Sequence, residues 1–420
     1  MRNIWNFILE NSLLLILGTL IALMWVNLDY TSYSTFKNLH IVDNFFFGHA
    51  HAGENGEVHH SLTLYFLVNE LLMSIFFAIA GKEIWEAMVL EKGSIRGRKA
   101  LTPLIATLGG MVGPIIIYLI IAYSFGSTTF DAIKNGWAIP TATDIAFSYL
   151  VGRLIFGADH PAIQFLLLLA IADDALGLII LAIFYPSSEI TPAWLLVSLT
   201  SAVMVYSLFN YFPTYLDKDT EQKLCTKWVR EKLALWPYII AGTISWYAFY
   251  KSGLHPALGL LPIIPAIPHS ETDLGIFAED EDKRKDLLNQ AEHYLKPIVA
   301  IVLFFFGLLN AGVEFSAVGE TTYAVLLGLL IGKPLGIFVF GFIGAYVLKF
   351  GLSANMNNKD LLVVGCVAAI GFTVSLFITS VAFTTGEIQD TAKMGALLSF
   401  VAAPIAFLMA KILSVSVQKN

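Results

Sequence analysis

Residues 161–185 read PAIQFLLLLAIADDALGLIILAIFY, and this stretch decides how the rest of the chain is interpreted. It is long and apolar enough to cross a bilayer as one helix, yet Asp173 and Asp174 stand side by side at its midpoint. A charged residue at that depth costs about 2.5–3.5 kcal/mol on insertion scales, and two adjacent carboxylates also repel each other. Carboxylates inside a membrane generally mark ion or proton pathways. The pair therefore predicts a functional site within a transmembrane helix.

The composition extends the membrane assignment to the whole chain. Of the 420 residues, 57% are hydrophobic and 14% are charged, whereas soluble domains carry about 25% charged residues. Cys225 and Cys366 fall in a predicted loop and a predicted span, so neither suggests a disulfide or a metal site. We expect an all-α polytopic membrane protein whose residues 1–420 form a single transmembrane domain.

Apolar windows predict twelve transmembrane helices. The apolar run that begins at Asn11 has no small-residue cleavage site, so we interpret it as a retained first span and not as a signal peptide. The expected limits of the spans are 11–28, 63–85, 101–123, 137–155, 161–185, 192–211, 235–250, 254–268, 297–316, 321–348, 360–384 and 392–414.

The distribution of Lys and Arg indicates the orientation of these spans. Nineteen of the 25 basic residues lie in the termini and the even-numbered loops or at the span ends that adjoin them, and Lys82 and Lys333 lie inside spans. The odd-numbered loops and the span ends that adjoin them hold four, which are Lys37, Lys134, Lys251 and Lys393. Because basic residues accumulate on the cytoplasmic side, we expect both termini in the cytoplasm.

The first outside loop, residues 29–61, carries a group of histidines. Asn55-Gly56 is a typical two-residue hairpin turn, and the histidines that flank it are His49, His51, His59 and His60. Paired strands would bring them together as metal ligands. The alternative, which we prefer, is that they are solvent-facing loop residues.

The predicted span 137–155 is interrupted near its middle by Pro140, Thr141, Thr143 and Asp144. Proline removes a backbone donor and frees a carbonyl group. Such breaks are tolerated at membrane depth where they line a cavity. This span therefore predicts a broken helix beside a polar site.

A second weak point lies in the predicted span 360–384, at Gly365, Gly371 and Thr373. The spans that precede the two interrupted ones, 101–123 and 321–348, resemble each other in their Gly and Pro positions. In the twelve-span arrangement they run in opposite directions. Interrupted helices at matching places in two inverted halves indicate a transporter binding site.

Charge pairing connects these segments. Lys333, in the middle of a predicted span, must find an anion or lose its proton. Asp173 and Asp174 point about 100° apart around a helix, so one can face Lys333 while the other faces a cavity with Asp144 and Thr143. Carboxylate, hydroxyl and carbonyl oxygens suit small hard cations. Na⁺ and protons would compete for the same oxygens, as an exchanger requires.

Six motifs together resemble the NhaA-type Na⁺/H⁺ antiporters of bacteria, over about residues 11–413. They are GWAIPTATDIAF (136–147), LAIADDALG (169–177), KSGLHPALGL (251–260), NAGV (310–313), IGKPLGI (331–337) and GFTVSLFI (371–378).

The resemblance implies a role for each matching residue of the predicted site. Asp174 corresponds to the principal ion-binding carboxylate, with Asp173 as its partner, and both would bind Na⁺. Lys333 corresponds to the basic residue that pairs with Asp173. Asp144 corresponds to the residue where two broken helices cross. Thr143 lies beside it, and Thr373 lies on the other broken helix.

Two further residues resemble positions linked in the family to pH response, Glu83 and His255. The alternative for His255 is a satisfied histidine at a helix end. The sequence departs from the family pattern at Gly81-Lys82-Glu83-Ile84-Trp85-Glu86, where the family has Gly-Leu-Glu followed by basic residues. This departure bears on the pH profile and not on the ion site.

The resemblance implies a secondary active Na⁺ or Li⁺/H⁺ antiporter of the bacterial inner membrane. It would expel Na⁺ for more than one H⁺, serve pH and sodium homeostasis, and need no cofactor and no nucleic acid. The core helices would be about 101–185 and 321–414. The remaining helices would form the interface of a homodimer, with the 40–60 hairpin as a contact.

Other classes of membrane protein also use intramembrane aspartates. An aspartyl protease needs a Gly-x-Gly-Asp motif, which does not occur in the sequence. A prenyltransferase needs Asp-rich repeats, but Ala-Leu-Gly-Leu-Ile follows Asp174. A Na⁺-coupled transporter of another solute, such as an organic anion, is the closer alternative. Direct cation/proton exchange agrees better with the paired aspartates and Lys333.

Overall fold

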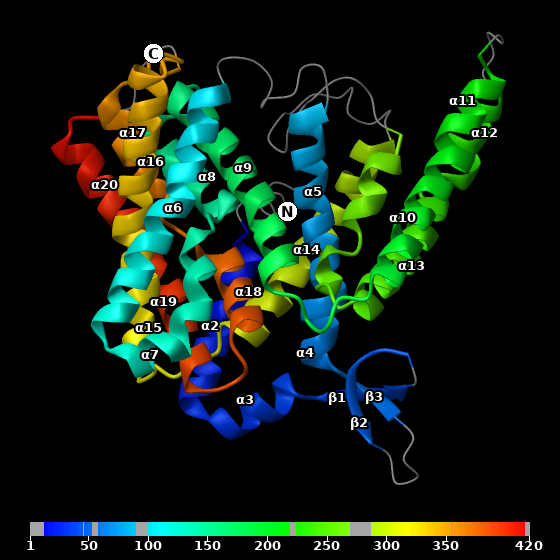
Figure 1. Ribbon diagram of the computed structural model, residues 1–420, viewed down its shortest axis with the longest axis horizontal. Helices are drawn as coiled ribbons and strands as arrows, with labels where there is room; N and C mark the ends of the chain where they lie inside the picture. Colours follow the sequence, from blue (N-terminus) through cyan, green and yellow to red (C-terminus); the bar gives the residue numbers. More distant parts are fainter. Residues whose placement is uncertain are drawn as a thin grey trace, which may run out of the picture. The chain divides into compact units, whose positions relative to one another are not determined.

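The computed structural model describes residues 12–44, 46–52, 58–89, 100–218, 224–268, 287–353 and 355–415 (Figure 1). The chain divides into two compact units. Unit 1 comprises Met1–Tyr33, Ser94–Ile180 and Gly307–Asn420, and unit 2 comprises Ser34–Gly93 and Leu181–Phe306.

Seven helices in the described part of the chain are long and apolar enough to cross a membrane, or eight if one bent pair counts as a span. The seven are Leu64–Val89, Leu101–Ser124, Pro161–Phe184, Pro192–Leu216, Leu287–Asn310, Glu320–Val347 and Glu387–Ile412. Each overlaps a predicted span, although Leu287–Asn310 begins ten residues before the predicted span 297–316. The other five predicted spans are shorter or broken in the structure. The protein is therefore a helical, multi-pass membrane protein.

Unit 1 contains most of the broken helices. Its elements begin with α2 (Leu13–Leu28), α6 (Leu101–Ser124), α7 (Ser127–Ile133), the 3-10 helix η3 (Lys134–Thr141), α8 (Ile145–Phe156) and α9 (Pro161–Phe184, which extends into unit 2). They continue with α15 (Glu320–Leu327), η9 (Gly328–Gly332), α16 (Lys333–Phe342), η10 (Ile343–Val347), α17 (Asn358–Ala368), α18 (Phe372–Ala382), α19 (Glu387–Leu398), η11 (Ser399–Val401) and α20 (Ala402–Ile412).

Both interruptions predicted from the sequence are present in unit 1. Pro140 lies in the 3-10 helix η3, and Ala142 and Asp144 then adopt extended backbone before α8 begins. The helices α17 and α18 are bent by 49° at the break between them. Pro140 explains the first break, because it cannot donate the backbone hydrogen bond that an α-helix needs there.

Unit 2 contains the remaining helices. They are α4 (Leu64–Phe66), η1 (Leu67–Leu72), α5 (Met73–Val89), α10 (Pro192–Tyr206), η4 (Ser207–Tyr211), α11 (Phe212–Leu216), α12 (Leu224–Trp228), η5 (Val229–Leu233), α13 (Trp236–Ser252), η6 (Pro256–Leu258), η7 (Leu261–Ala266) and α14 (Leu287–Asn310, which ends in unit 1). The short helix α3 (Tyr30–Lys37) lies at the boundary of the two ranges.

The predicted span 254–268 is not one regular helix. It consists of the two 3-10 turns η6 and η7. Pro256, Pro262 and Pro265 fall within these turns, and each lacks the backbone N–H that would extend an α-helix. The window is apolar and largely buried, but it is too rich in proline to form a full-length helix.

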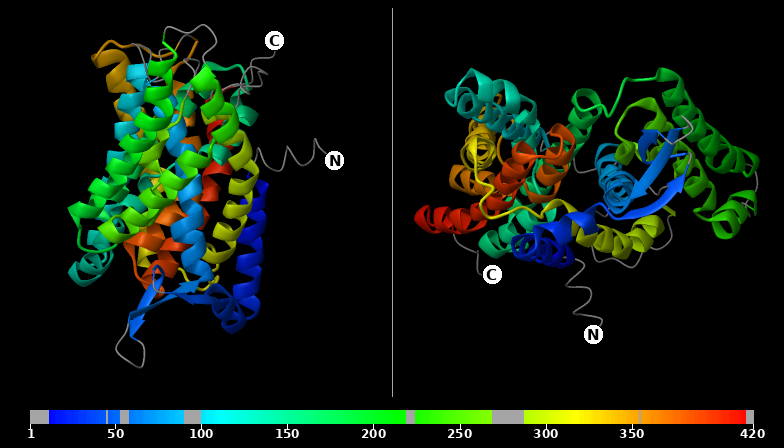
Figure 2. Two further views of the ribbon diagram at one scale, coloured as in Figure 1. Left: turned by 90° about the vertical axis from the view of Figure 1, so that its right-hand side faces the viewer. Right: turned by 90° about the horizontal axis from the view of Figure 1, so that it is seen from below.

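The chain is mostly helical, as expected of an all-α membrane protein, and residues 40–44, 49–52 and 58–63 form a small antiparallel sheet in addition. Its strands are β1 (His40–Asn44), β2 (His49–Ala52) and β3 (Val58–Thr63), in the order β1-β3-β2. The left view of Figure 2 shows these blue strands below the lower end of the lighter blue helix that begins with α4. The antiparallel pairing of β2 with β3 agrees with the predicted hairpin, whose turn at 54–57 lies outside the described residues.

The sheet also shows where the histidines of this loop lie along its strands. The register sets His51 opposite His59, although the side chains of His49, His51 and His59 lie outside the description. His60 Nδ1 is 3.2 Å from the carbonyl oxygen of Gly48. Among the described residues there is no group of three His, Cys, Asp or Glu side chains placed to hold a metal ion.

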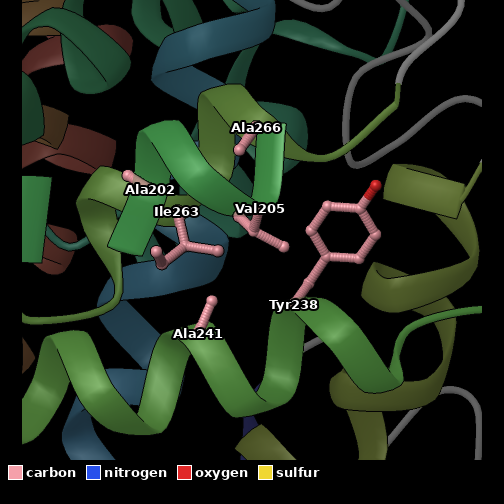
Figure 3. Packing of buried hydrophobic residues seen from close by; sticks show 6 residues of the cluster. All are labelled: Ala202, Val205, Tyr238, Ala241, Ile263 and Ala266. Carbon is pink, nitrogen blue, oxygen red and sulfur yellow. The ribbon is translucent and has the colours of Figure 1, made fainter. Parts of the chain in front are cut away.

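The core of unit 2 is packed with small side chains. Ala202 and Val205 of α10 meet Tyr238 and Ala241 of α13, and η7 contributes Ile263 and Ala266 (Figure 3). Alanine at such contacts lets helix backbones approach closely, which is the common mode of packing inside membranes. Hydrogen bonds add to this packing, for example from the Ser201 hydroxyl of α10 to the carbonyl oxygen of Ala241 at 3.1 Å.

Candidate functional site

Asp144 connects the two interruptions of unit 1. It is the N-cap residue of α8, where its Oδ1 accepts a hydrogen bond from Phe147 N at 3.3 Å. Its Oδ2 accepts from the backbone N–H of Thr373 at 3.2 Å and from the Thr373 hydroxyl. Thr373 lies in the first turn of α18. One buried carboxylate therefore stands at the positive ends of two helices, where a negative charge is favoured.

Further hydrogen bonds join the backbone at the two breaks. Asp144 N donates to Ile370 O at 2.7 Å, and the Thr143 hydroxyl donates to Ala368 O at 3.1 Å. Thr143 is fully buried. These bonds satisfy carbonyl groups that the break leaves without partners in their own helix. The two interrupted segments consequently form one connected structure.

Lys333 and Asp173 form a buried ion pair in the same unit. Lys333 Nζ lies 2.8 Å from Asp173 Oδ2, and both side chains are almost fully buried. The ammonium also donates to the carbonyl oxygen of Thr141, the last residue of η3. A cation is favoured at the C-terminal end of a helix. Thr143 also lies next to Asp173.

Asp174 is the more accessible of the two adjacent aspartates. It is partly buried, whereas Asp173 is 3% exposed. Its carboxyl group lies within electrostatic reach of Asp173, Asp144 and Lys333. Asp173 is therefore the aspartate that faces Lys333. That Asp174 faces an aqueous cavity with Asp144 and Thr143 stays a prediction.

The chemistry of this cluster favours a small cation. If all groups are ionised, the three aspartates and Lys333 carry a net charge of −2, which is costly inside a membrane unless a cation or protons compensate it. The oxygens available at the cluster are carboxylates, threonine hydroxyls and carbonyls of broken helices. Such hard oxygen ligands suit ions of the Na⁺ type and also accept protons.

The two residues expected in pH response belong to unit 2. Glu83 is a buried residue of α5. His255 precedes η6, and its Nδ1 accepts a hydrogen bond from Ala257 N at 3.3 Å. The same nitrogen lies 3.5 Å from Glu70 Oε2. The description of His255 as a histidine at a helix end is therefore correct, and its acidic neighbour is an addition.

The residues near Glu83 that depart from the family pattern take part in a buried ion-pair cluster. Lys82 Nζ lies 2.7 Å from Glu86 Oε2, one helical turn further along α5. It also lies 2.6 Å from Glu292 Oε2 of α14. The lysine that interrupts the expected charge order thus ties two helices of unit 2 together.

The sequence analysis missed three polar residues that the structure places in these contacts. The Ser148 hydroxyl donates to Val367 O at 3.1 Å, and the Ser375 hydroxyl donates to Ile139 O at 2.8 Å. Ser148 follows Asp144 by four residues and so shares its face of α8, which was a usable signal. Glu70 is a carboxylate in the predicted span 63–85, so the rule that singled out Asp173 applied to it as well.

The helices and the buried carboxylates at their breaks define the class of this protein as a multi-pass membrane transporter. A family model described as Na⁺/H⁺ antiporter 1 matches residues 6–410. The chain belongs to this family, and it is accordingly a transporter and not an enzyme.

Individual relatives agree with the family match along the entire chain. An Na⁺/H⁺ antiporter NhaA of Jannaschia sp. (strain CCS1) is 60% identical over 419 residues, which cover 100% of both chains. An antiporter NhaA of Geobacter sulfurreducens is 41% identical over 419 residues and 99% of each chain. One of Desulfitobacterium hafniense (strain Y51) is 42% identical and covers 99% of this chain and 97% of the relative.

Proposed function

We propose that this chain is a Na⁺/H⁺ antiporter that also accepts Li⁺ and moves more than one proton for each cation expelled. The observation that carries the proposal is the cluster of Asp144, Asp173, Asp174 and Lys333 at the two helix breaks. Membership of the antiporter family supports direct exchange over coupled transport of an organic anion.

In the proposed cycle, Asp174 binds either Na⁺ or a proton and is the principal exchanging group. Asp173 is the second carboxylate that contacts Na⁺. When Na⁺ draws Asp173 toward itself, the ion pair with Lys333 opens. The lysine, left without its anion in a medium of low dielectric constant, then releases a proton. One proton leaves Asp174 and a second leaves Lys333 for each Na⁺ bound.

The remaining residues of the cluster shape the site. Asp144 offsets the positive ends of α8 and α18 and helps to attract the cation. Thr373 orients Asp144 through its hydrogen bonds, and Thr143 joins the two broken segments through its bond to Ala368 O. The exchange needs no cofactor under this scheme, because the transported ions are the only species that bind.

The proposal includes an arrangement in the membrane. Twelve spans, two of them interrupted and crossing in an inverted repeat, would lie in the bacterial inner membrane with both termini in the cytoplasm. The core helices would be about 101–185 and 321–414, and the other helices would form a homodimer interface together with the sheet of residues 40–63. Glu83 and His255 would contribute to pH response in sodium and pH homeostasis.

The decisive experiment uses proteoliposomes with an imposed proton gradient and a fluorescent pH probe. Adding Na⁺ or Li⁺, with no organic solute present, should collapse the gradient. Asp131→Asn is a suitable control, since Asp131 is an exposed carboxylate of α7 in unit 1. A gradient that stays intact until an organic anion is supplied would contradict direct exchange.

A further inference from the structure

Two Gly-x-x-x-Gly motifs of unit 1 pack directly against each other. Gly109 and Gly113 lie on α6, and Gly332 and Gly336 lie at the junction of η9 with α16. The two helices lie side by side (Figure 1). Glycines spaced by four residues let helix backbones approach closely in a membrane. Lys333 is inside the second motif, directly after Gly332.

The approach of the two backbones leaves no space for a methyl group. A Cβ atom on Gly336 would overlap the carbonyl oxygen of Gly109 and lie 2.7 Å from its carbonyl carbon. A Cβ atom on Gly332 would lie 2.6 Å from the Cα of Pro114. The obstructing atoms are backbone atoms, which cannot move aside by rotating a side chain. Any larger residue must therefore separate α6 from α16.

This close contact bears directly on the ion pair. Lys333 is the first residue of α16, and its side chain is fully buried. Its ammonium must reach both Asp173 and the Thr141 carbonyl oxygen from that position. A shift of α16 relative to α6 therefore moves the Cα atom of Lys333, from which the side chain must reach both partners.

We propose that the contact between the two glycine motifs positions Lys333 for its ion pair with Asp173 and thereby sets the Na⁺ affinity of the site. The glycines act through the lysine and do not touch the ion. This inference rests on the proposed function, in which Na⁺ must displace Lys333 from Asp173. Loosening the pair should therefore make Na⁺ bind more tightly, which a general loss of stability would not do.

The test measures the Na⁺ concentration that gives half of the maximal thermal stabilisation of the purified protein in detergent. Gly336→Ala should lower this concentration by about threefold or more, within the range of coupling between residues in contact. It should also reduce the dependence of Na⁺ efflux on membrane potential in proteoliposomes. Gly344→Ala is the matched control on the same continuous helix, because its Cβ atom would lie 3.4 Å or more from its neighbours.

A double-mutant cycle shows whether the glycine acts through the lysine. In a Lys333→Gln background, Gly336→Ala should produce no further change in the half-saturating Na⁺ concentration. If Gly336→Ala does not fold, Gly110→Ala replaces it in the cycle. Its Cβ atom would lie 2.9 Å from the Ile337 side chain and 4.0 Å from Lys333 Cε, so it disturbs the same contact more mildly.

The outcomes separate this inference from the proposed function. If the wild-type protein shows neither Na⁺-dependent stabilisation nor exchange, the proposed function is wrong. If the wild type binds and exchanges Na⁺ but the glycine variant keeps or raises the half-saturating concentration, the positioning role alone is wrong. The positioning role is also wrong if Gly336→Ala changes the half-saturating Na⁺ concentration equally in the Lys333→Gln background.

Discussion

The ammonium of Lys333 lies 2.8 Å from Oδ2 of Asp173, and the two residues are 160 positions apart in the chain. A buried pair of this kind costs desolvation energy that its attraction repays only with good geometry and further hydrogen bonds. Here the Thr141 carbonyl supplies a further acceptor for the lysine. A net gain in stability therefore does not explain the pair, whereas its proposed role in exchange does.

Asp174→Asn should abolish exchange while the protein still inserts and purifies normally. Asparagine keeps the shape of the side chain but loses the charge that binds Na⁺ and the site that carries the proton. The measurement is Na⁺-dependent collapse of a proton gradient in proteoliposomes, with Asp131→Asn as the control. Wild-type rates from the Asp174 variant would remove this residue from its proposed role.

Asp144→Asn should weaken the apparent affinity for Na⁺ more than it lowers the maximal rate. The variant loses charge-assisted hydrogen bonds at two helix ends, each worth about 1.5–3 kcal/mol. Partial compensation by the asparagine oxygen leaves an expected increase of about tenfold in the KM for Na⁺, since 1.4 kcal/mol corresponds to a factor of ten. Initial rates over a range of Na⁺ concentrations check this. An unchanged KM with a lost maximal rate would show that Asp144 acts in turnover.

Lowering the pH should raise the apparent KM for Na⁺. Protons and Na⁺ compete for the same carboxylate oxygens, so the site holds fewer cations as more protons bind. Where both exchanging groups are protonated in the cation-free site, two protons leave for each Na⁺ bound, so the KM should rise by up to about a hundredfold for each pH unit. Rates measured with equal pH on both sides of the membrane test this. A KM that is constant across the active range contradicts the competition.

The features that rest on local chemistry were predictable from the sequence. Pro140 marks one helix break because of its missing backbone donor, and Asp173 and Asp174 are conspicuous because charges are rare in apolar helices. Residue spacing alone does not show whether Asp173 or Asp174 is the partner of Lys333, because this depends on how α9 is rotated against α16. The resemblance to the family supplied that choice.

Other features depend on contacts that no local pattern records. The Asn55-Gly56 turn predicted the pairing of β2 with β3, but the pairing of β1 with β3 depends on a contact between segments further apart in the chain. The glycines of α6 and α16 were noticed as a repeated pattern, but only the structure shows that Gly109 meets Gly336. The spacing of the pattern suggests a helix contact in general, and the partner becomes known only when the helices are packed.

The exchange should depend on membrane potential, because more than one proton is proposed to enter for each Na⁺ expelled. With two protons, each cycle moves one net charge, worth about 2.3 kcal/mol per 100 mV. That energy corresponds to roughly a 50-fold change in the Na⁺ gradient at equilibrium, at 1.4 kcal/mol for each factor of ten.

The potential is set with K⁺ and valinomycin, and both the rate of Na⁺ efflux and its end-point are measured. Lys333→Gln should still exchange Na⁺ for the proton on Asp174, but one for one, so its rate and end-point should ignore the potential. The glutamine cannot release the second proton, whereas the control Asp131→Asn leaves Lys333 and Asp173 in place and should respond like the wild type. If the wild-type end-point is the same at every imposed potential, the exchange is electroneutral, and the second proton does not come from the pair of Asp173 and Lys333.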